Sequence, residues 1–513
     1  MVQDDGGTKA DNRGETLTMR RALNVATMGS FANMAIGVVS ALVVSRVYGA
    51  AILGAYALAY VGVAMLPLAT SLCEQPALVR LLAMEPQRGE RGSGLALAAL
   101  TLSYTLTLLI GPLVALGSAF YLIHAARLPE AVAPMVALVI GYIVLDKLSW
   151  NIDGVLSAYR AAGPLAIANL LNSGVMATAA IVLALAHRSL WSLTIASLIS
   201  SAAALGFRLW AVRPYLRWKV PRDAYRGGLR EIPGMIRFGL RMLPGSISEG
   251  LTFQSALWVL GATAPVASVG AFSRAQSITV KIGDLNHRLA AVIYPSLVRR
   301  AHINDGGRSF VADVMTLLSR TFAPLFIVLC GAAGASHTIL ALFGQDFLSA
   351  EGALSVLLIA TGISIATMIF GEGLTALNRP SLVSIGYVVG LIATLGPLIP
   401  LTRSYGATGA AVAFLIGTAT STVFLFTALV VASPGKFGPH HLAIRGLALA
   451  ASSVVAYALV HWVQTVAGAP LTAAVGFALT GLVLWARRRA ISERHDVEDD
   501  QTVLGSRSRN ELA

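Results

Sequence analysis

Apolar blocks of about 20 residues recur along the whole chain, separated by short polar stretches. An α-helix of that length crosses the roughly 30 Å hydrocarbon core of a bilayer and pairs its backbone polar groups within its own segment. Alternating segments of about ten residues, the pattern of membrane β-barrels, are absent. The pattern predicts an all-α polytopic membrane protein with about fourteen transmembrane helices. We expect these helices near 22–45, 51–73, 94–117, 131–150, 163–186, 190–212, 238–262, 266–294, 312–333, 352–373, 381–401, 406–431, 442–462 and 465–486.

Composition agrees with a membrane protein. Of the 513 residues, 56% are hydrophobic and 12% are charged, whereas roughly a quarter of the residues are charged in soluble chains. The net charge of +13 is compatible with nucleic-acid binding, but basic residues also collect in the cytoplasmic loops of membrane proteins. The placement of the basic residues separates these two explanations.

Basic residues gather on one side of the predicted topology. That side carries Arg20, Arg21, Arg80, Arg88, Arg91, Arg160, Arg217, Lys219, Arg222, Arg226, Arg230, Arg299, Arg300, Arg308, Lys436 and Arg487 to Arg489. The opposite side carries only Arg46, Arg127, Arg188 and Arg403. We therefore expect both termini in the cytoplasm, an even number of helices and no nucleic-acid partner.

The apolar pattern divides the chain into six parts. They are a disordered cytoplasmic N-terminus (1–20), an N-lobe of six helices (21–212), a basic cytoplasmic connector (213–237), a C-lobe of six helices (238–431), two further helices (442–486) and a cytoplasmic tail (487–513). The first apolar block lacks a small-residue cleavage site and is too long for a signal sequence, so it is expected to be retained. Cys73 and Cys330 lie inside apolar spans and are expected to be packing residues.

Short motifs of the first half recur in the second half at a shift of about 216 residues. The Gly-Ala-Tyr of 54–56 returns as Gly-Ala-Phe at 270–272, and the Asp-Gly-Val of 153–155 returns as Glu-Gly-Leu at 372–374. A repeat of six helices would relate the two lobes by a pseudo-two-fold axis along the membrane normal. Transporters built in this way bind their substrate between the lobes.

The eighth predicted helix carries three basic residues at a spacing of seven, Arg274, Lys281 and Arg288. This spacing places them on one helix face, about 10 Å apart. A charge at a helix centre costs on the order of 2.5–3.5 kcal/mol on insertion scales, so such residues usually face a polar cavity. We interpret them as a cationic ladder for an anionic substrate such as a diphosphate, since arginine binds phosphate oxygens in pairs. A structural role stays open, in which Arg288 snorkels and Lys281 pairs with Asp284.

Three more ionisable residues fall in the C-lobe, Arg241, Glu249 and Arg320. We group the two arginines with the cationic ladder as candidate substrate-binding residues. Glu249 and Asp284 are the candidates for a carboxylate that binds a coupling ion, with a structural counter-charge as the alternative.

Asp146, Lys147 and Asp153 lie near the cytoplasmic end of the fourth predicted helix. Solvation of a helix end is the interpretation we favour for them, and a gate is the alternative. Signatures of hydrolytic, metal or nucleotide chemistry are absent: the chain has neither an HExxH motif nor a GxxxxGKS loop. No cofactor, metal or catalytic residue is therefore expected.

Four motifs resemble those of Wzx-type polysaccharide exporters, in the multidrug/oligosaccharidyl-lipid/polysaccharide exporter superfamily. The Arg-Val-Tyr-Gly of 46–49 with the Leu-Gly-Ala-Tyr-Ala-Leu of 53–58 resembles that family's junction of helices 1 and 2. The Gly-Ala-Phe-Ser-Arg-Ala of 270–275 and the Tyr-Pro-Ser-Leu of 294–297 resemble the start and end of its helix 8. The Leu-Phe-Gly-Gln-Asp-Phe of 342–347 is similar to the loop before its helix 10. The resemblance covers roughly residues 20–490 and depends on the order of the motifs.

The resemblance implies a flippase in the bacterial cytoplasmic membrane. Such a protein moves an oligosaccharide on an undecaprenyl diphosphate carrier to the outer leaflet, for O-antigen or exopolysaccharide synthesis. It works beside a polysaccharide polymerase and chain-length machinery. Family members have a cationic cavity between two lobes, and Arg274 and Lys281 are the positions to which this role carries over.

Three other functions stay open: a lipid II flippase, a cation-coupled drug antiporter, and a membrane-embedded polymerase or ligase. Lipid II flippases are expected to carry an Arg-Asp pair in helix 1, where this chain offers only Ser30, Asn33 and Ser40. Cation-coupled drug antiporters usually place a carboxylate in the interior of the N-lobe, whereas the acids of this lobe, Asp146 and Asp153, are expected near the end of the fourth helix. A positive ladder would also repel their cationic substrates. A membrane-embedded polymerase or ligase would need a reactive outer loop, but the outer loops here are short and carry few charges.

Overall fold

The computed structural model describes residues 6–70, 78–79, 81–82, 90–159, 161–216, 220–303, 308–433 and 453–466. Helix dominates this part of the chain, and no β-strand occurs within it. The all-α class predicted from the apolar pattern is therefore confirmed. The described elements are α1 (Gly6–Thr70), α3 (Glu90–His124), η1 (Pro129–Ala131), α4 (Val132–Gly141), η2 (Tyr142–Asp146), α5 (Lys147–Ala158), α6 (Ala162–Ala186), α7 (Leu190–Val212), α8 (Arg222–Thr263), α9 (Val266–Ile303), α10 (Arg308–Gly334), α11 (Ser336–Ala341), η3 (Gln345–Ala350), α12 (Glu351–Ala376) and α13 (Pro380–Ala432), followed by a helix over Ser453–Val466.

Two of these elements contain a sharp kink. The backbone leaves helical geometry at Gly49 in α1, where φ is 74°, and at Gly406 in α13, where φ is 55°. Glycine tolerates positive φ because it has no Cβ. Each kink falls where the sequence predicts one crossing to end and the next to begin. Both α1 and α13 are therefore two predicted transmembrane helices in succession.

The chain is a multi-pass membrane protein. Eight helices of the described part are long and apolar enough to cross a bilayer. The twelve predicted helices from 22–45 to 406–431 all overlap described helices, and the thirteenth overlaps Ser453–Val466. The count of fourteen stays a prediction, because 467–486 lies outside the described residues.

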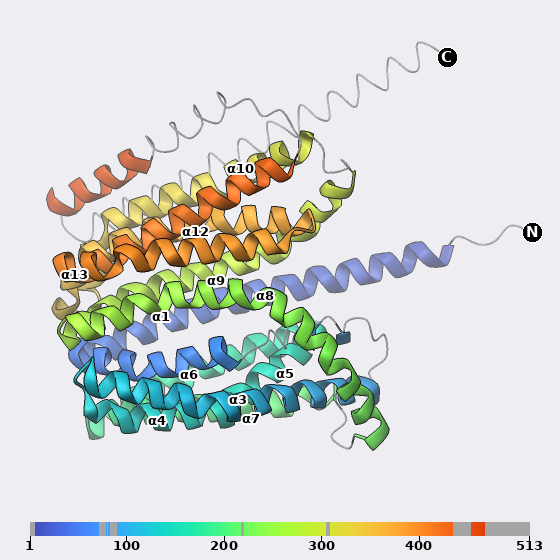
Figure 1. Ribbon diagram of the computed structural model, residues 1–513, viewed down its shortest axis with the longest axis horizontal. Helices are drawn as coiled ribbons and strands as arrows, with labels where there is room; N and C mark the ends of the chain where they lie inside the picture. The colour runs from blue at the N-terminus through green and yellow to red at the C-terminus, as the bar shows by residue number, and fades with distance from the viewer. Residues whose placement is uncertain are drawn as a thin grey trace, which may run out of the picture.

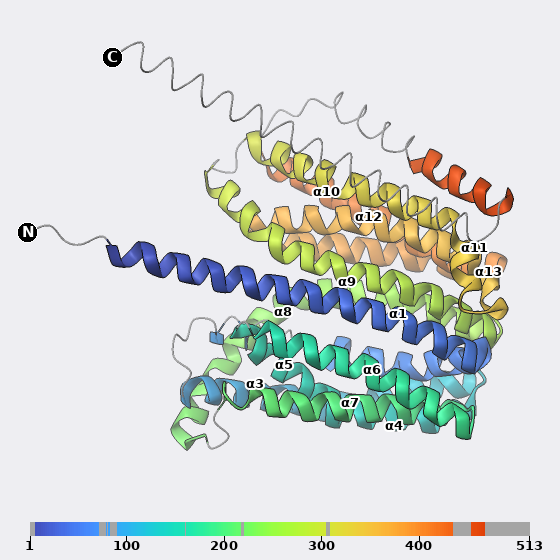
Figure 2. The ribbon, with the colours of Figure 1, turned by 180° about the vertical axis from the view of Figure 1, so that it is seen from behind.

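The helices form two bundles that lie side by side (Figures 1 and 2). One bundle contains α3 to α7, and the other contains α10 to α13. The long helices α1, α8 and α9 run between them. α1 packs against both α6 and α9, and α8 packs against both α3 and α13, so these helices join the two bundles.

The two bundles also repeat one another in helix boundaries. α5 ends at Ala158 and α6 begins at Ala162; α12 ends at Ala376 and α13 begins at Pro380. Both pairs of boundaries are 218 residues apart. This offset agrees with the shift of about 216 residues between the sequence motifs.

Two segments differ from the boundaries predicted from polarity. α1 begins at Gly6, inside the segment expected to be disordered. The predicted connector is helical from Arg222 and continues into the next crossing as α8. A Cβ on Gly228 would lie 2.4 Å from the carbonyl oxygen of Gly94, so the start of α8 packs directly on α3.

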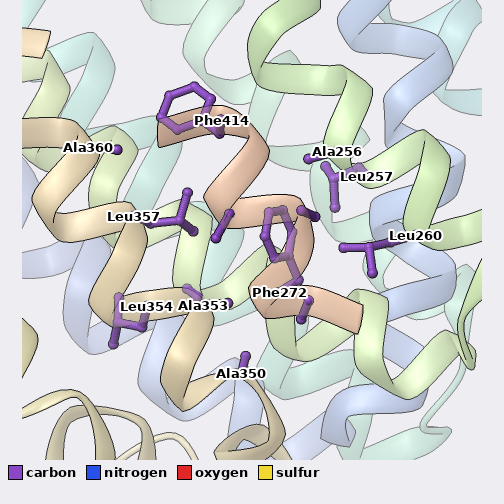
Figure 3. Close-up of a cluster of buried hydrophobic side chains, with 14 of the residues drawn as sticks. Ala256, Leu257, Leu260, Phe272, Ala350, Ala353, Leu354, Leu357, Ala360 and Phe414 are labelled. Atoms are coloured by element: carbon purple, nitrogen blue, oxygen red, sulfur yellow. The ribbon is translucent and has the colours of Figure 1, made fainter. Parts of the chain in front are cut away.

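A single large apolar cluster spans both bundles. Figure 3 shows its centre, where Phe272 of α9 lies among side chains of α8, α12 and α13. Phe272 is 0% exposed, and so are Leu260, Leu354 and Ala353 around it. Close packing of this kind, rather than the hydrophobic effect, holds helices together in lipid. The cluster holds α9 against the other helices of the C-lobe.

The bundles touch backbone to backbone at one end of the molecule. A Cβ on Gly54 would lie 1.9 Å from the carbonyl oxygen of Val266, and a Cβ on Gly270 would lie 1.9 Å from that of Ala50. Only glycine permits this approach between α1 and α9. We call this end, defined by Ala50, Gly54, Val266 and Gly270, the closed end.

Two motifs from opposite halves of the sequence meet at the closed end. The Nε atom of Arg46 donates a hydrogen bond to the carbonyl oxygen of Leu342 over 2.8 Å. A Cβ on Gly49 would lie 3.6 Å from Oδ2 of Asp346. The Arg-Val-Tyr-Gly and Leu-Phe-Gly-Gln-Asp-Phe motifs are therefore parts of one contact.

Candidate functional site

A polar cavity of about 420 Å³ lies between the N-lobe and α9. It has a volume typical of ligand sites, which span roughly 300–1,000 Å³. Its walls come from α1, η2, α6, α7 and α9, with Phe343 from the chain between α11 and η3. We call it the central cavity. Its lining contains Gly37, Val38, Ser40, Ala41, Val44, Leu53, Tyr56, Tyr60, Asp146, Asn172, Ser173, Met176, Leu193, Ser197, Ser200, Ser201, Arg274, Ser277, Ile278, Lys281 and Phe343.

Arg274 and Lys281 lie in the same wall of the central cavity. The sequence predicts this pairing, because a spacing of seven returns to one face of a helix. The Nε atom of Arg274 is buried and has no hydrogen-bond partner among the described residues. Lys281 reaches toward α1, because a Cβ on Gly37 would lie 3.7 Å from its Cε.

The opposite wall, formed by the N-lobe, is rich in hydroxyls. Tyr56 and Tyr60 of α1 stack with their ring centroids 6.0 Å apart, and Tyr60 is 44% exposed. Beside them, Ser173 of α6 donates a hydrogen bond to Oδ1 of Asn33 over 2.8 Å. Two of the three polar residues expected inside the first helix, Asn33 and Ser40, therefore lie at this wall; the side chain of Ser30 lies outside the described part.

Asp146 belongs to this wall, and its place corrects the prediction of a solvated helix end. It is the last residue of η2, a π-helical segment between α4 and α5. A π segment inserts one residue into a helix and so turns the side chains that follow it. The carboxylate faces the central cavity and accepts a hydrogen bond from the Ser201 hydroxyl. Lys147, its neighbour, is 1% exposed and lies outside the cavity lining.

Asp153 is also not a solvated helix end. Arg208 of α7 donates two hydrogen bonds to it, from Nε to Oδ1 over 2.7 Å and from a terminal nitrogen to Oδ2 over 3.0 Å. The same terminal nitrogen lies 3.1 Å from Oδ1 of Asn169. Sequence reasoning did not single out Arg208, although a lone arginine in an otherwise apolar helix is a signal that it needs a buried partner.

Glu249 lies in a second, smaller cavity of about 60 Å³ inside the C-lobe. Thr252 and Tyr387 line it with Glu249, together with hydroxyls of α12 and α13. Glu372 is close enough to act on Tyr387 electrostatically, as Glu249 also is. Glu249 is thus separate from the central cavity.

Four other candidate residues cannot be placed at either site. The backbone positions of Arg241, Asp284, Arg288 and Arg320 fall in α8, α9 and α10, but their side chains lie outside the described part of the chain. The structure therefore describes two of the three side chains of the cationic ladder, those of Arg274 and Lys281.

An apolar cavity of about 450 Å³ lies between α1, α3 and α8. Gly62, Gly117 and Trp258 are among its lining residues. The Tyr121 hydroxyl at its wall donates a hydrogen bond to the carbonyl oxygen of Trp258 over 2.6 Å. This cavity lacks charged groups and does not extend the polar site.

Comparison with known proteins agrees with the motifs. Residues 101–351 match the family described as polysaccharide biosynthesis protein. A comparison with the sequences of curated proteins gives no match. Among solved structures, the lipid II flippase MurJ in an inward closed conformation superposes with a TM-score of 0.69 at 13% identity, covering 92% of this chain and 99% of that one.

Two drug transporters are also similar in fold. An inward-facing multidrug resistance MATE family transporter of the MOP superfamily superposes with a TM-score of 0.56 at 16% identity, over 80% of this chain and 93% of that one. The eukaryotic MATE transporter AtDTX14 gives 0.51 at 14% identity, over 81% and 96%. The resemblance predicted from the sequence is confirmed: the chain has the fold of MOP-superfamily transporters, and its residues 101–351 match the polysaccharide biosynthesis family.

Proposed function

We propose that the chain is a flippase for oligosaccharide repeat units linked to undecaprenyl diphosphate, acting in the bacterial cytoplasmic membrane by alternating access. The observation that carries this proposal is that Arg274, whose buried Nε has no acceptor among the described residues, lines one wall of a cavity together with Lys281. A buried donor without a partner costs about 1–3 kcal/mol, and more when charged. The oxygens of a diphosphate in the cavity would supply acceptors for the Arg274 and Lys281 side chains that line it.

The chemistry of the two cations suits a diphosphate. Arginine and lysine side chains carry only hydrogen-bond donors, and arginine binds phosphate oxygens in a bidentate manner. The low dielectric of a membrane interior strengthens this attraction. We propose Arg241, Arg288 and Arg320 as further residues that bind the diphosphate, on the basis of the sequence alone.

Alternating access requires an interface that can open and close. The glycine contact between α1 and α9 keeps the closed end shut in this structure. The distribution of basic loops assigns the closed end to the outer face, so the central cavity would receive its substrate from the cytoplasm. The surface-polysaccharide polymerase and its chain-length machinery would then act on the released product.

Glu249 and Asp284 are the proposed carboxylates for ion coupling. Glu249 is surrounded by Thr252, Tyr387 and other hydroxyls in its small cavity. Hydroxyl and carboxylate oxygens are the ligands that small cations take in proteins. A structural counter-charge for the nearby arginines is the competing role for both residues.

Export by single-residue variants tests the proposed substrate site. In a strain that depends on this chain for surface polysaccharide, Arg274→Ala and Lys281→Ala should each lower export at least tenfold, because each removes a charge-assisted contact. The exposed Arg379 is the matched control, and Arg379→Ala should export normally. Protein level and membrane insertion are measured in parallel.

The same strains distinguish the alternatives. Carrier-linked repeat units should accumulate on the inner face; accumulation on the outer face would point to a polymerase or ligase. Drug sensitivity with intact surface polysaccharide would favour an antiporter. Normal export by both single variants and by the double variant would contradict the proposed diphosphate site.

A further inference from the structure

The central cavity has two chemically different walls. Arg274 and Lys281 on α9 provide only hydrogen-bond donors. The wall that faces them provides the Asp146 carboxylate, which only accepts hydrogen bonds, and a group of hydroxyls. A ligand that satisfies both walls must be anionic at one end and rich in hydroxyl donors at the other.

The serines of α7 strengthen the accepting character of the N-lobe wall. Ser197, Ser200 and Ser201 follow the spacing of three and four that places residues on one helix face. The hydroxyl of Ser200 donates to the carbonyl oxygen of Ser197 over 2.8 Å, and that of Ser201 donates to Asp146. A serine hydroxyl that has used its proton still offers acceptor lone pairs. The wall therefore presents acceptors to the cavity.

Asp146 differs from the other carboxylate of the same crossing. Asp153 is neutralised by Arg208 through two hydrogen bonds. About two turns closer to the cavity, α7 presents the Ser201 hydroxyl to Asp146, and Arg208 acts on this carboxylate electrostatically without a hydrogen bond to it. The carboxylate thus remains beside a hydroxyl wall, and the π-helical segment Tyr142–Asp146 directs it there. Such segments are found frequently at functional sites.

A phosphate group fits poorly beside this wall. Its oxygens only accept hydrogen bonds and carry negative charge, so Asp146 would repel them. Sugar hydroxyls, in contrast, donate to carboxylate and serine oxygens. The stacked rings of Tyr56 and Tyr60, both in the lining, offer flat apolar faces to the C–H side of a sugar ring.

We infer that the N-lobe wall of the central cavity binds the first sugar of a glycosyl diphosphate, with Asp146 accepting hydrogen bonds from its hydroxyls while Arg274 and Lys281 hold the diphosphate. This inference rests on the proposed function and names which part of the substrate each wall binds. Asp146 is then a residue that determines specificity for a glycosylated carrier over the bare lipid diphosphate.

Binding of two short-chain probes to the purified full chain tests the inference. The probes are farnesyl diphosphate and the same lipid diphosphate carrying N-acetylglucosamine. Wild-type protein should bind the glycosylated probe about 10- to 100-fold more tightly, the worth of one hydrogen bond to a charged group. Asp146→Asn should remove most of this preference and leave the affinity for farnesyl diphosphate within about twofold.

Three further variants test a second residue of the N-lobe wall, an acid outside the cavity, and the opposite wall formed by α9. Ser197→Ala removes one neutral acceptor and should reduce the preference about two- to tenfold. Glu130→Gln, an exposed acid outside the cavity, should behave as wild type. Arg274→Ala should weaken both probes equally, since both carry the diphosphate.

The outcomes separate the inference from the proposed function. If wild-type protein binds neither probe, the proposed function fails. If it binds both and Arg274→Ala weakens both, but Asp146→Asn weakens neither or both equally, the diphosphate site stands and the sugar wall is refuted. Equal weakening with a loss of pH-dependent transport would instead assign Asp146 to ion coupling.

Discussion

Asp146 and Asp153 sit seven residues apart on one crossing and meet different partners. Arg208 donates hydrogen bonds to both Asp153 and Asn169, over 2.7–3.1 Å. Asp146 lies at the central cavity beside Ser201. The same residue type therefore stabilises the N-lobe at one level and remains available to a ligand at the other.

Removal of Arg208 should destabilise the protein strongly. Arg208 is 7% exposed, so Arg208→Leu leaves the Asp153 carboxylate in a poorly solvated place without its charge partner. Breaking a buried ion pair from one side typically costs about 3–5 kcal/mol. Thermal unfolding of the purified protein in detergent should therefore show a lower midpoint than wild type, while Arg403→Leu, at an exposed arginine, should show none of this loss.

The double variant Asp153→Leu with Arg208→Leu provides the decisive comparison. Replacing both members of a buried pair by apolar residues is often neutral or stabilising. The double variant should therefore unfold at a higher temperature than Arg208→Leu alone. A double variant as unstable as the single one would show that the arginine acts through contacts other than the ion pair.

For single residues, the sequence predicted the shared helix face of Arg274 and Lys281 correctly, but not the surroundings of Asp146 and Asp153. Arg274 and Lys281 were found from their spacing, because helical periodicity alone places residues seven apart on one face. The roles of Asp146 and Asp153 depend on a π-helical segment and on Arg208, which is 55 residues beyond Asp153. Neither role can be predicted from local sequence, since both depend on how η2 and α5 pack against α7.

Among the helices, α1 and α9 form the backbone contact at the closed end. Gly54 and Gly270 allow their backbones to touch, and the two glycines occupy equivalent places in the Gly-Ala-aromatic motifs of the two halves. The sequence predicted the repeat and most helix boundaries, because apolar length is a property of each segment by itself. It did not predict that the repeated motifs contact each other, since a contact between distant segments leaves no periodic pattern.

A methyl group at the closed end should separate α1 from α9. Gly270→Ala places a Cβ 1.9 Å from the carbonyl oxygen of Ala50, a distance at which the backbone must move. Spin labels at Ala51→Cys in α1 and at Gln345→Cys in η3, which packs on α9, report the opening by electron–electron distance measurement in a Cys73→Ala, Cys330→Ala background. The population at longer distances should increase in Gly270→Ala.

Gly117→Ala is the matched control, because nothing lies within 4 Å of a Cβ at that position. Its distance distribution should equal that of the parent protein. Identical distributions for Gly270→Ala and the parent would mean that the glycine contact does not hold the closed end together.

At the scale of the whole molecule, the orientation in the membrane is predicted from the sequence, and the closed end is identified from the structure. The basic loops predict which face of the membrane is cytoplasmic, and the glycine contact identifies the end of the molecule that is shut. Arg46, one of the few basic residues predicted outside, donates its hydrogen bond at that same end. The fold class and the two-lobe plan follow from the sequence, whereas the conformational state does not, because both states of a transporter share one sequence and one apolar pattern.

Together these signals predict that the central cavity is reached from the cytoplasm. Ser277 lines the cavity, and Arg403 is exposed in the predicted outer segment between the two halves of α13. In the cysteine-free background, Ser277→Cys should react with a membrane-impermeant maleimide in inside-out vesicles at least tenfold faster than in spheroplasts. Arg403→Cys should show the reverse order, because a charged reagent crosses neither the hydrocarbon core nor the closed end.

Fast labelling of Ser277→Cys in spheroplasts, with Arg403→Cys labelled there as expected, would mean that the cavity opens outward in the membrane. If Ser277→Cys reacted only in spheroplasts and Arg403→Cys only in inside-out vesicles, the closed end would be the cytoplasmic one, and the topology drawn from the basic residues would have to be inverted.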